Sequence, residues 1–167
     1  VLTIISQETK VQSPDNKIVV TINYEENLSY SVTFKGAPIV NQSQLGFEFK
    51  DEAPMAGGFT LSGFTSKPVD ETWVPVVRSK HALVRDHYNE LQLRLTEKAA
   101  PLRQMEMTIR VYDDGAAFRF RLFRGARIGD RQITKELTTF SIPGDPKAWI
   151  VEYSKGYYSS NEAEFFE

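Results

Sequence analysis

The feature that most constrains the fold of this chain is an alternation of apolar and polar residues with a period of two. In Leu91–Leu95 and in Met105–Val111 every second residue is apolar, and Phe118–Leu122 repeats the pattern. Because successive side chains of a β-strand point to opposite faces, such segments bury one face and expose the other. No window of eleven or more residues has a convincing helical period of 3.6, so the sequence predicts an all-β protein.

Turn residues divide the chain into short strands. Ile18–Tyr24 and Leu28–Phe34 are rich in β-branched and aromatic residues and are joined by a turn-length connection, as in a hairpin. Asp113-Asp114-Gly115 offers residue types that tolerate the positive φ angles of a tight hairpin turn. Further strands are expected at Val1–Ile5, Pro38–Val40, Leu45–Phe49, Phe59–Phe64, Val69–Val77, Gln132–Leu137, Thr139–Ile142 and Ala148–Tyr153, with a loop at Asp51–Gly58.

This series of short strands is typical of an antiparallel two-sheet sandwich or a barrel. No internal repeat or interdomain linker interrupts it, so residues 1–167 are expected to form a single domain. The residues expected in its core are Phe34, Phe47, Leu93, Leu95, Ile109, Val111, Phe118 and Phe120.

Composition excludes several classes of protein. The chain has 167 residues, with 20 Lys and Arg against 22 Asp and Glu, and it has no cysteine. The net charge of −2 excludes a generally basic nucleic-acid binder, so no nucleic-acid partner is expected. Without cysteine there is no disulfide framework, iron–sulfur cluster or thiol nucleophile. No run approaches the ~20 apolar residues of a membrane span.

Candidate catalytic residues are few. Asp86 and His87 suggest acid–base chemistry because histidine titrates near neutral pH, but neighbours on a strand point to opposite faces. A structural role is therefore favoured for both. Asp113-Asp114-Gly115 resembles part of a calcium-binding loop, yet the later ligands of an EF-hand are missing, so a hairpin turn is favoured. No catalytic residue is predicted within the chain.

Two groups of surface residues have competing interpretations. An arginine-rich stretch that includes Arg119 and Arg121 could bind an anion, but alternation with phenylalanine favours the outer face of a half-buried strand. Single-stranded nucleic acid would need aromatic rings on that same face. Trp73 and Trp149 could stack on sugar rings, although burial in the core of a sandwich is the commoner position for tryptophan.

Four segments, taken in order, resemble a known family. They are Ser13–Ile18 (SPDNKI), Asp70–Val76 (DETWVPV), Arg85–Leu91 (RDHYNEL) and Arg110–Arg119 (RVYDDGAAFR). Each is weak alone, but together they are specific. The chain is similar over essentially its whole length to the N-terminal domain of glycoside hydrolase family 97, the α-glucosidases and α-galactosidases of bacterial polysaccharide-utilisation systems.

The resemblance implies a β-super-sandwich similar to galactose mutarotase, packed against a catalytic (β/α)8 barrel. The chain is expected to be an incomplete fragment of that sandwich. The catalytic carboxylates of the family belong to the barrel, so this chain alone is expected to be inactive. Its implied partners are its own barrel domain and an α-linked oligosaccharide. The implied location is the periplasm or the outside of a bacterial cell.

The resemblance also implies a metal ligand. Members of the family bind calcium near the active site and take one glutamate from the N-terminal domain. The corresponding stretch here is Tyr158–Phe166, in which Glu162 fits best as the calcium ligand and Glu164 is the alternative.

Two rival functions remain open from sequence. One is a free-standing carbohydrate-binding β-sandwich module, and the other is a structural or adhesive sandwich that binds no sugar. The length of the complete open reading frame separates the enzyme from both rivals.

Overall fold

The computed structural model describes residues 8–78, 80–123 and 132–147 of the chain. Within these ranges the chain forms eleven β-strands, and every strand pair is antiparallel. The prediction of an antiparallel all-β fold is therefore confirmed. None of the described segments is a helix long and apolar enough to cross a membrane.

The first sheet contains the N-terminal strands in the order β1-β2-β3-β4. The predicted hairpin forms its centre, where Ile18 lies opposite Phe34. The turn into the next strand has φ angles of 51° at Lys35 and 82° at Gly36, as in the tight turns that suit a twisted hairpin. The four strands are β1 (Glu8–Gln12), β2 (Ile18–Asn23), β3 (Ser29–Phe34) and β4 (Ala37–Gln44).

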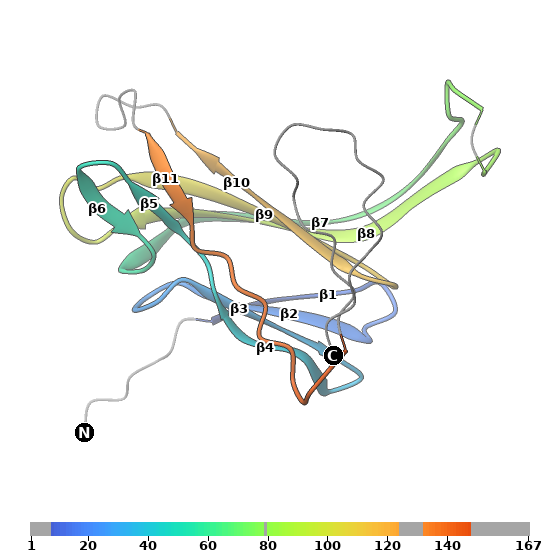
Figure 1. Cartoon of the computed structure of the whole chain (residues 1–167). Coiled ribbons are helices and arrows are strands. Elements are labelled where there is room, and N and C mark those ends of the chain that lie inside the picture. Colours follow the sequence, from blue (N-terminus) through green and yellow to red (C-terminus); the bar gives the residue numbers. More distant parts are fainter. Residues whose placement is uncertain (1–7, 79, 124–131, 148–167) are drawn as a thin grey trace, which may run out of the picture.

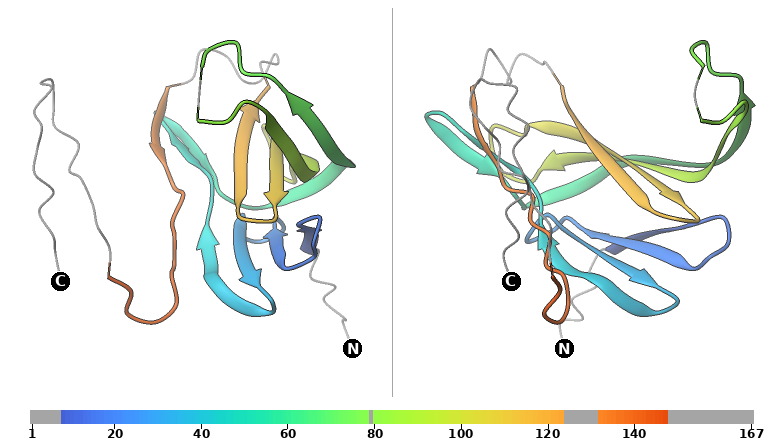
Figure 2. Two further views of the ribbon diagram at one scale, coloured as in Figure 1. Left: turned by 90° about the vertical axis from the view of Figure 1, so that its right-hand side faces the viewer. Right: turned by 45° about the vertical axis from the view of Figure 1, so that its right-hand side comes forward.

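The second sheet has the order β10-β9-β8-β7, and a small third sheet has the order β11-β5-β6. Figures 1 and 2 show the first two sheets stacked as two layers, which is the arrangement of a sandwich. The strands of the second sheet are β7 (Phe59–Trp73), β8 (Val84–Glu97), β9 (Gln104–Tyr112) and β10 (Ala116–Leu122). Those of the third are β5 (Phe47–Phe49), β6 (Glu52–Met55) and β11 (Ile133–Glu136).

The core lies between the two large sheets and consists of the alternating apolar residues. Leu93, Leu95 and Ile109 of the second sheet are fully buried, and so is Ile22 of the first. Of the residues predicted for the core, Phe47 and Val111 are also buried, while Phe118 and Phe120 are half-buried against the core cluster. The prediction for Phe34 is wrong: this residue ends β3 beside the turn, where it is 38% exposed and its ring centre lies 5.3 Å from the Lys35 ammonium instead of in the core.

Two expected boundaries are wrong. The strands predicted at Phe59–Phe64 and Val69–Val77 merge into one strand, β7, in which Pro68 pairs with Asn89. This strand ends at Trp73, so Val74–Val77 are not part of it. Because β7 is an edge strand, the missing N–H of a proline is tolerated there. The loop predicted at Asp51–Gly58 contains the short strand β6, which pairs with β5.

The remaining predicted elements have mixed outcomes. The Asp113-Asp114-Gly115 turn joins β9 to β10 as expected, but without positive φ angles. The segment Thr139–Ile142 forms no strand, although the Thr139 N–H donates to the Gln44 carbonyl oxygen at 3.0 Å. Val1–Ile5 and Ala148–Tyr153 lie outside the described residues.

Candidate functional site

The four segments that carry the family resemblance meet at one end of the sandwich. The Asp15 N–H in the β1–β2 turn donates to Asp113 Oδ1 at 2.8 Å, although the two residues are 98 positions apart. Asp113 Oδ2 also lies 3.6 Å from Nδ1 of His87 on β8. On the neighbouring strand, Asp70 receives hydrogen bonds from Arg85 Nε at 2.6 Å and Nη2 at 2.7 Å. We call these five residues the end cluster.

Charge pairing dominates the end cluster. The hydrogen bond from Lys17, with a second from Ser13, holds the pKa of the Asp15 carboxyl well below its usual range. The hydrogen bonds from Arg85 lower the pKa of Asp70 in the same way. Both carboxylates are therefore ionised at neutral pH and engaged with cations. These ion-paired carboxylates stabilise the β1–β2 turn and the β7–β8 strand pair. Their lowered pKa values make them poor proton acceptors at neutral pH.

The predicted structural role of Asp86 and His87 agrees with this geometry. His87 lies near Asp113, while Asp86 sits opposite Glu71 in the strand pairing. The buried Ser13 hydroxyl donates to Asp15 Oδ1 at 2.7 Å and accepts from the Ile18 N–H at 3.0 Å. Its bonds are internal to the β1–β2 turn. The end cluster is thus a structural junction.

The predicted metal ligand cannot be placed. Glu162 and the alternative Glu164 lie outside the described residues. Within the described ranges, no group of three or more His, Cys, Asp or Glu side chains could hold a metal ion.

A long two-stranded ribbon projects from the sandwich next to the end cluster. It consists of the distal halves of β7 and β8 and their connection, and Figures 1 and 2 show it extending beyond both layers. We call residues 67–88 the arm. Trp73, predicted to be buried, is 50% exposed here because none of the described sheets covers the arm. Trp149 lies outside the described residues.

The tip of the arm carries an exposed apolar surface that sequence reasoning missed. Its residues are Trp73, Val74, Val76, Val77 and Leu83. Apart from Trp73, each is more than 60% exposed, and Val76 is 102% exposed. Grouped apolar exposure of this kind marks interaction surfaces in soluble proteins. The only sequence signal is the apolar run around Pro75, at the end of the strand predicted at Val69–Val77.

The described residues therefore form a β-sandwich with a projecting arm whose tip is apolar. Residues 11–167 match the profile of the glycosyl-hydrolase 97 N-terminal family. The chain belongs to this family, and the resemblance inferred from sequence is confirmed.

Similar proteins agree with this assignment. A retaining alpha-galactosidase of Bacteroides thetaiotaomicron is 27% identical over 154 residues, which are 92% of this chain and 22% of that protein. A probable retaining alpha-galactosidase of Streptomyces bingchenggensis is 29% identical over 77% of this chain and 19% of that protein. A solved glycoside hydrolase family 97 enzyme of Pseudoalteromonas sp. strain K8, in complex with panose, superposes with a TM-score of 0.76 at 30% identity.

The structural match covers 81% of this chain and 20% of the Pseudoalteromonas enzyme. The chain therefore spans about a fifth of the length of the relatives it matches. A beta-arabinopyranosidase with a TM-score of 0.72 and 24% identity shares the fold.

Proposed function

We propose that this chain is the N-terminal β-sandwich domain of a bacterial enzyme that hydrolyses α-glycosidic bonds. Its role is to support a (β/α)8 catalytic barrel, to shape one wall of the substrate pocket and to lend one carboxylate to calcium. The observation that carries the proposal is the family match over residues 11–167, in relatives about five times longer than the matched region. A likeness to galactose mutarotase and a periplasmic or secreted location form part of the same proposal.

The arm supports a role in binding another domain. An apolar surface at its tip would be costly to leave in water, and a domain of the same protein would be a permanent cover for it. We propose that the tip of the arm packs against the catalytic barrel. Its five apolar side chains would then be buried in the intact enzyme.

The substrate class follows from the relatives. Two of them are named as alpha-galactosidases, and a third was solved with panose and with acarbose. We propose an α-linked oligosaccharide as the substrate of the complete protein, either an α-galactoside or an α-glucoside. Such hydrolysis uses two carboxyl groups, about 5–5.5 Å apart for retention and about 6.5–9.5 Å apart for inversion.

The rival functions differ in what the chain does alone. We expect the 167-residue chain to turn over no aryl α-galactoside or α-glucoside, and the complete protein to hydrolyse at least one of them. Turnover by the purified chain, free of host glycosidases, would contradict the assignment. An open reading frame that ends soon after Glu167 would favour a carbohydrate-binding module or a structural sandwich instead.

Calcium is the proposed cofactor, and Glu162 is its proposed ligand from this chain. Calcium takes six to eight oxygen ligands at about 2.3–2.6 Å, so a single carboxylate cannot form the site alone. Residues of the barrel and waters would have to complete the coordination. Glu162 would supply negative charge and one or two of the oxygens.

A matched pair of variants tests this ligand. In the complete protein, Glu162→Gln keeps the shape of the side chain but removes its charge, so calcium affinity and turnover should fall together. Glu164→Gln is the control and should change both much less. Calcium titration by calorimetry gives the answer: an unchanged affinity for Glu162→Gln, or a larger loss for Glu164→Gln, would identify the wrong glutamate.

A further inference from the structure

The outer face of the β7–β10 sheet is a grid of charged and polar side chains in which cations lie opposite carboxylates. Glu90 on β8 lies between Arg110 on β9 and Lys67 on β7. Glu106 on β9 lies between Arg94 and Arg121 in the same way. Cross-strand pairs of opposite charge stabilise a sheet, so each of these carboxylates is stabilised by the cations beside it, although each row keeps one more cation than carboxylate.

One row across this face lacks a carboxylate. It runs from Arg119 on β10 through Thr108 on β9 and Gln92 on β8 to Thr65 on β7. Among the described residues, no acidic side chain lies within ion-pair distance of Arg119. Within the described residues Arg119 is therefore a cation without a carboxylate beside it, whereas Arg94 and Arg110 each form an ion pair with a neighbouring carboxylate.

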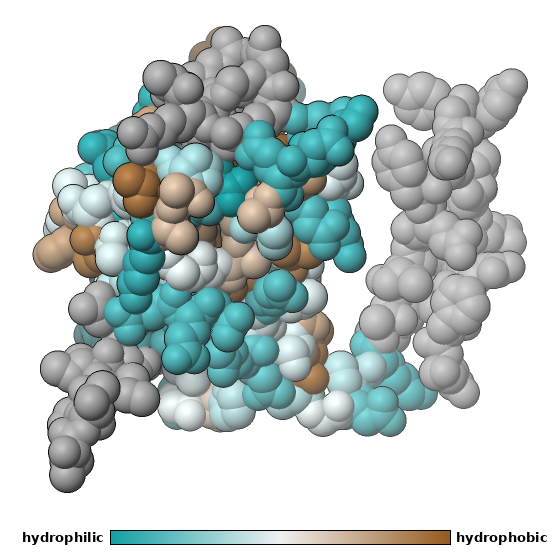
Figure 3. All heavy atoms as spheres, turned by 90° about the vertical axis from the view of Figure 1, so that its left-hand side faces the viewer, coloured by the Kyte–Doolittle hydropathy of each residue, from teal (hydrophilic) through white to brown (hydrophobic). Residues whose placement is uncertain are grey.

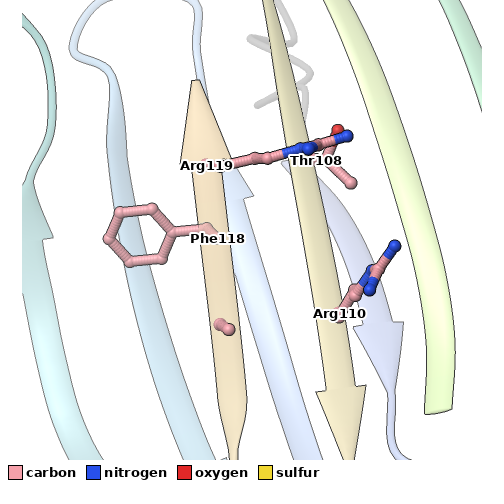
Figure 4. Close-up of a pocket in the computed structure, with 5 residues that line it drawn as sticks. Thr108, Arg110, Phe118 and Arg119 are labelled. Carbon is pink, nitrogen blue, oxygen red and sulfur yellow. The ribbon is translucent and has the colours of Figure 1, made fainter. Parts of the chain in front are cut away.

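A cavity of about 160 Å³ opens at the uncompensated end of this row. It is lined by Thr108, Arg110, Ala117, Phe118 and Arg119. Figure 4 shows that the two arginines and Thr108 project to the same side of β9 and β10, whereas the ring of Phe118 points to the opposite side. Ala117 lies opposite Arg110, and its small side chain leaves the space between the two guanidinium groups open.

The hydroxyl of Thr108 is the least expected feature of this cavity. Thr108 is only 4% exposed, yet its hydroxyl has no hydrogen-bond partner among the residues that the structure describes. A buried polar group without a partner is costly, typically about 1–3 kcal/mol. The hydroxyl lines a cavity between two cations, where an acceptor atom would satisfy it.

Arg110 is held in place before any ligand arrives. Its Nε lies 2.8 Å from Oε2 of the buried Glu90, and its guanidinium carbon lies 4.5 Å from the centre of the Tyr88 ring. A guanidinium has five N–H donors, and the contact with Glu90 is made through Nε. A pre-positioned cation loses little conformational entropy when it binds a ligand.

We propose that this cavity is a binding site for a single carboxylate group. Arg119 supplies the main charge, Thr108 donates its hydroxyl hydrogen and Arg110 forms the second cationic wall. Arg110 is already ion-paired with Glu90, which leaves the single charge of Arg119 for the ligand and favours a carboxylate over a phosphate dianion. The cavity is about ten times the ~10–15 Å³ of comparable volume that one water needs, which leaves room for the carboxylate and its first carbon atoms.

The proposal is tested by titrating acetate into the 15N-labelled chain at constant ionic strength, with sodium chloride as the reference salt. The arginine Nε–H signals are followed by NMR. The Arg119 signal should shift and saturate with acetate, while chloride alone should not reproduce the shift. Absence of a saturable shift at any acetate concentration that preserves the fold would overturn the site. Tighter binding of inorganic phosphate than of acetate would overturn the carboxylate class.

Three variants separate the site from general surface charge. Arg119→Gln should weaken acetate binding about tenfold or more, and Thr108→Val about threefold to tenfold, since each removes one donor. Arg121→Gln is the matched control, because it removes the same charge from the same strand opposite Glu106, and it should change affinity less than about twofold. Equal losses for Arg119→Gln and Arg121→Gln would mean nonspecific attraction.

A further variant tests the same contact in case Arg119→Gln does not fold. If circular dichroism shows that Arg119→Gln is unfolded, Arg119→Lys keeps the charge and removes the planar fork, and it should give an intermediate loss. An affinity unchanged by Arg119→Lys and by Thr108→Val would contradict the proposed contacts.

The carboxylate could come from a small molecule or from an acidic side chain of the same protein. Acetate titration of the complete protein distinguishes the two sources. Binding with the affinity of the isolated chain indicates a free carboxylate. An Arg119 signal already at its saturated position without acetate indicates a side chain that occupies the site.

Discussion

The two ends of the β7–β8 ribbon have the same strand pairing but opposite environments. At one end, Leu91, Leu93 and Leu95 are covered by the first sheet and are at most 3% exposed. At the other end, Trp73 is 50% exposed and pairs with Val84 at the start of β8. The ladder has fourteen paired positions from Phe59 to Trp73, with one register shift between Leu61 and Gly63. Backbone pairing can therefore extend a strand pair beyond the part of it that packs against the first sheet.

The arm must depend on weaker forces than the sandwich. An isolated two-stranded hairpin is marginally stable in water, and the arm has no buried face of its own. The bidentate Arg85–Asp70 pair supports it, but both side chains are more than half exposed. Glu71 and Asp86 lie directly opposite each other with like charge, which opposes the pairing.

The largest difference between the two regions should appear when an arginine is removed from each. Arg103 is 2% exposed, ion-paired with Glu97 and bonded to the carbonyl oxygens of Ala53 and Pro54. Arg103→Met should lower the free energy of unfolding by about 3–5 kcal/mol, because Glu97 keeps its charge without its partner.

The matched variant in the arm is Arg85→Met, which removes an exposed pair and should cost less than about 1 kcal/mol. Urea denaturation followed by circular dichroism measures both. Similar losses in the two variants would contradict the contrast between a buried and an exposed pair.

Apolar side chains should give the next largest difference. Leu93→Ala removes a fully buried side chain and should cost about 2–5 kcal/mol, since it leaves a cavity between the sheets. Val77→Ala at the tip of the arm, where Val77 is 77% exposed, should change stability by less than about 0.5 kcal/mol in the isolated chain. A large loss for Val77→Ala there would show that the tip is covered within the chain itself.

Acid should act on one ion pair in each region, Asp15–Lys17 in the β1–β2 turn and Asp70–Arg85 in the arm. The pKa of Asp15 and the pKa of Asp70 are both lowered in the folded chain, by hydrogen bonds from Lys17 and from Arg85. Groups with lowered pKa values stabilise the fold above their unfolded pKa, near 3.8, and that stabilisation is lost as pH falls through the folded pKa. Stability should therefore decline below about pH 4.

Asp15→Asn and Asp70→Asn separate the two contacts, because each variant should flatten part of this acid dependence. Urea titrations between pH 2 and 7 measure the slope. A slope identical to that of the original chain in both variants would assign the acid sensitivity to other carboxylates.

The smallest effect should come from the like-charged pair in the arm. Glu71→Lys places a cation opposite Asp86 and should stabilise the arm locally by about 0.2–1 kcal/mol, with Glu71→Gln giving part of that gain. Hydrogen exchange of the amides of β7 and β8 detects the change, which should be confined to the arm. Slower exchange throughout the sandwich would mean that the arm and core open together.

Much of the sandwich could be predicted from the sequence because strand alternation is a local property. The pattern in Met105–Val111 correctly assigns Met107, Ile109 and Val111 to the core and Arg110 to the outer face, where Thr108 is buried although it points away from the core. The hairpin predicted from Ile18–Tyr24 and Leu28–Phe34 is present as β2 and β3. The family, too, was recognisable from four short segments, since it depends on residue identities.

Only the tertiary structure decided which apolar strand faces are buried against another sheet. Trp73 and Phe34 carry the same apolar signal as Leu93, yet both are exposed, because neither lies between the two large sheets. The end cluster could not be predicted either, nor could the lack of an ion pair at Arg119 among the described residues, since each depends on the register between strands distant in sequence. The local sequence pattern determines which face of a strand a side chain lies on. Its burial and its charge partners depend on the neighbouring strands and on the opposite sheet.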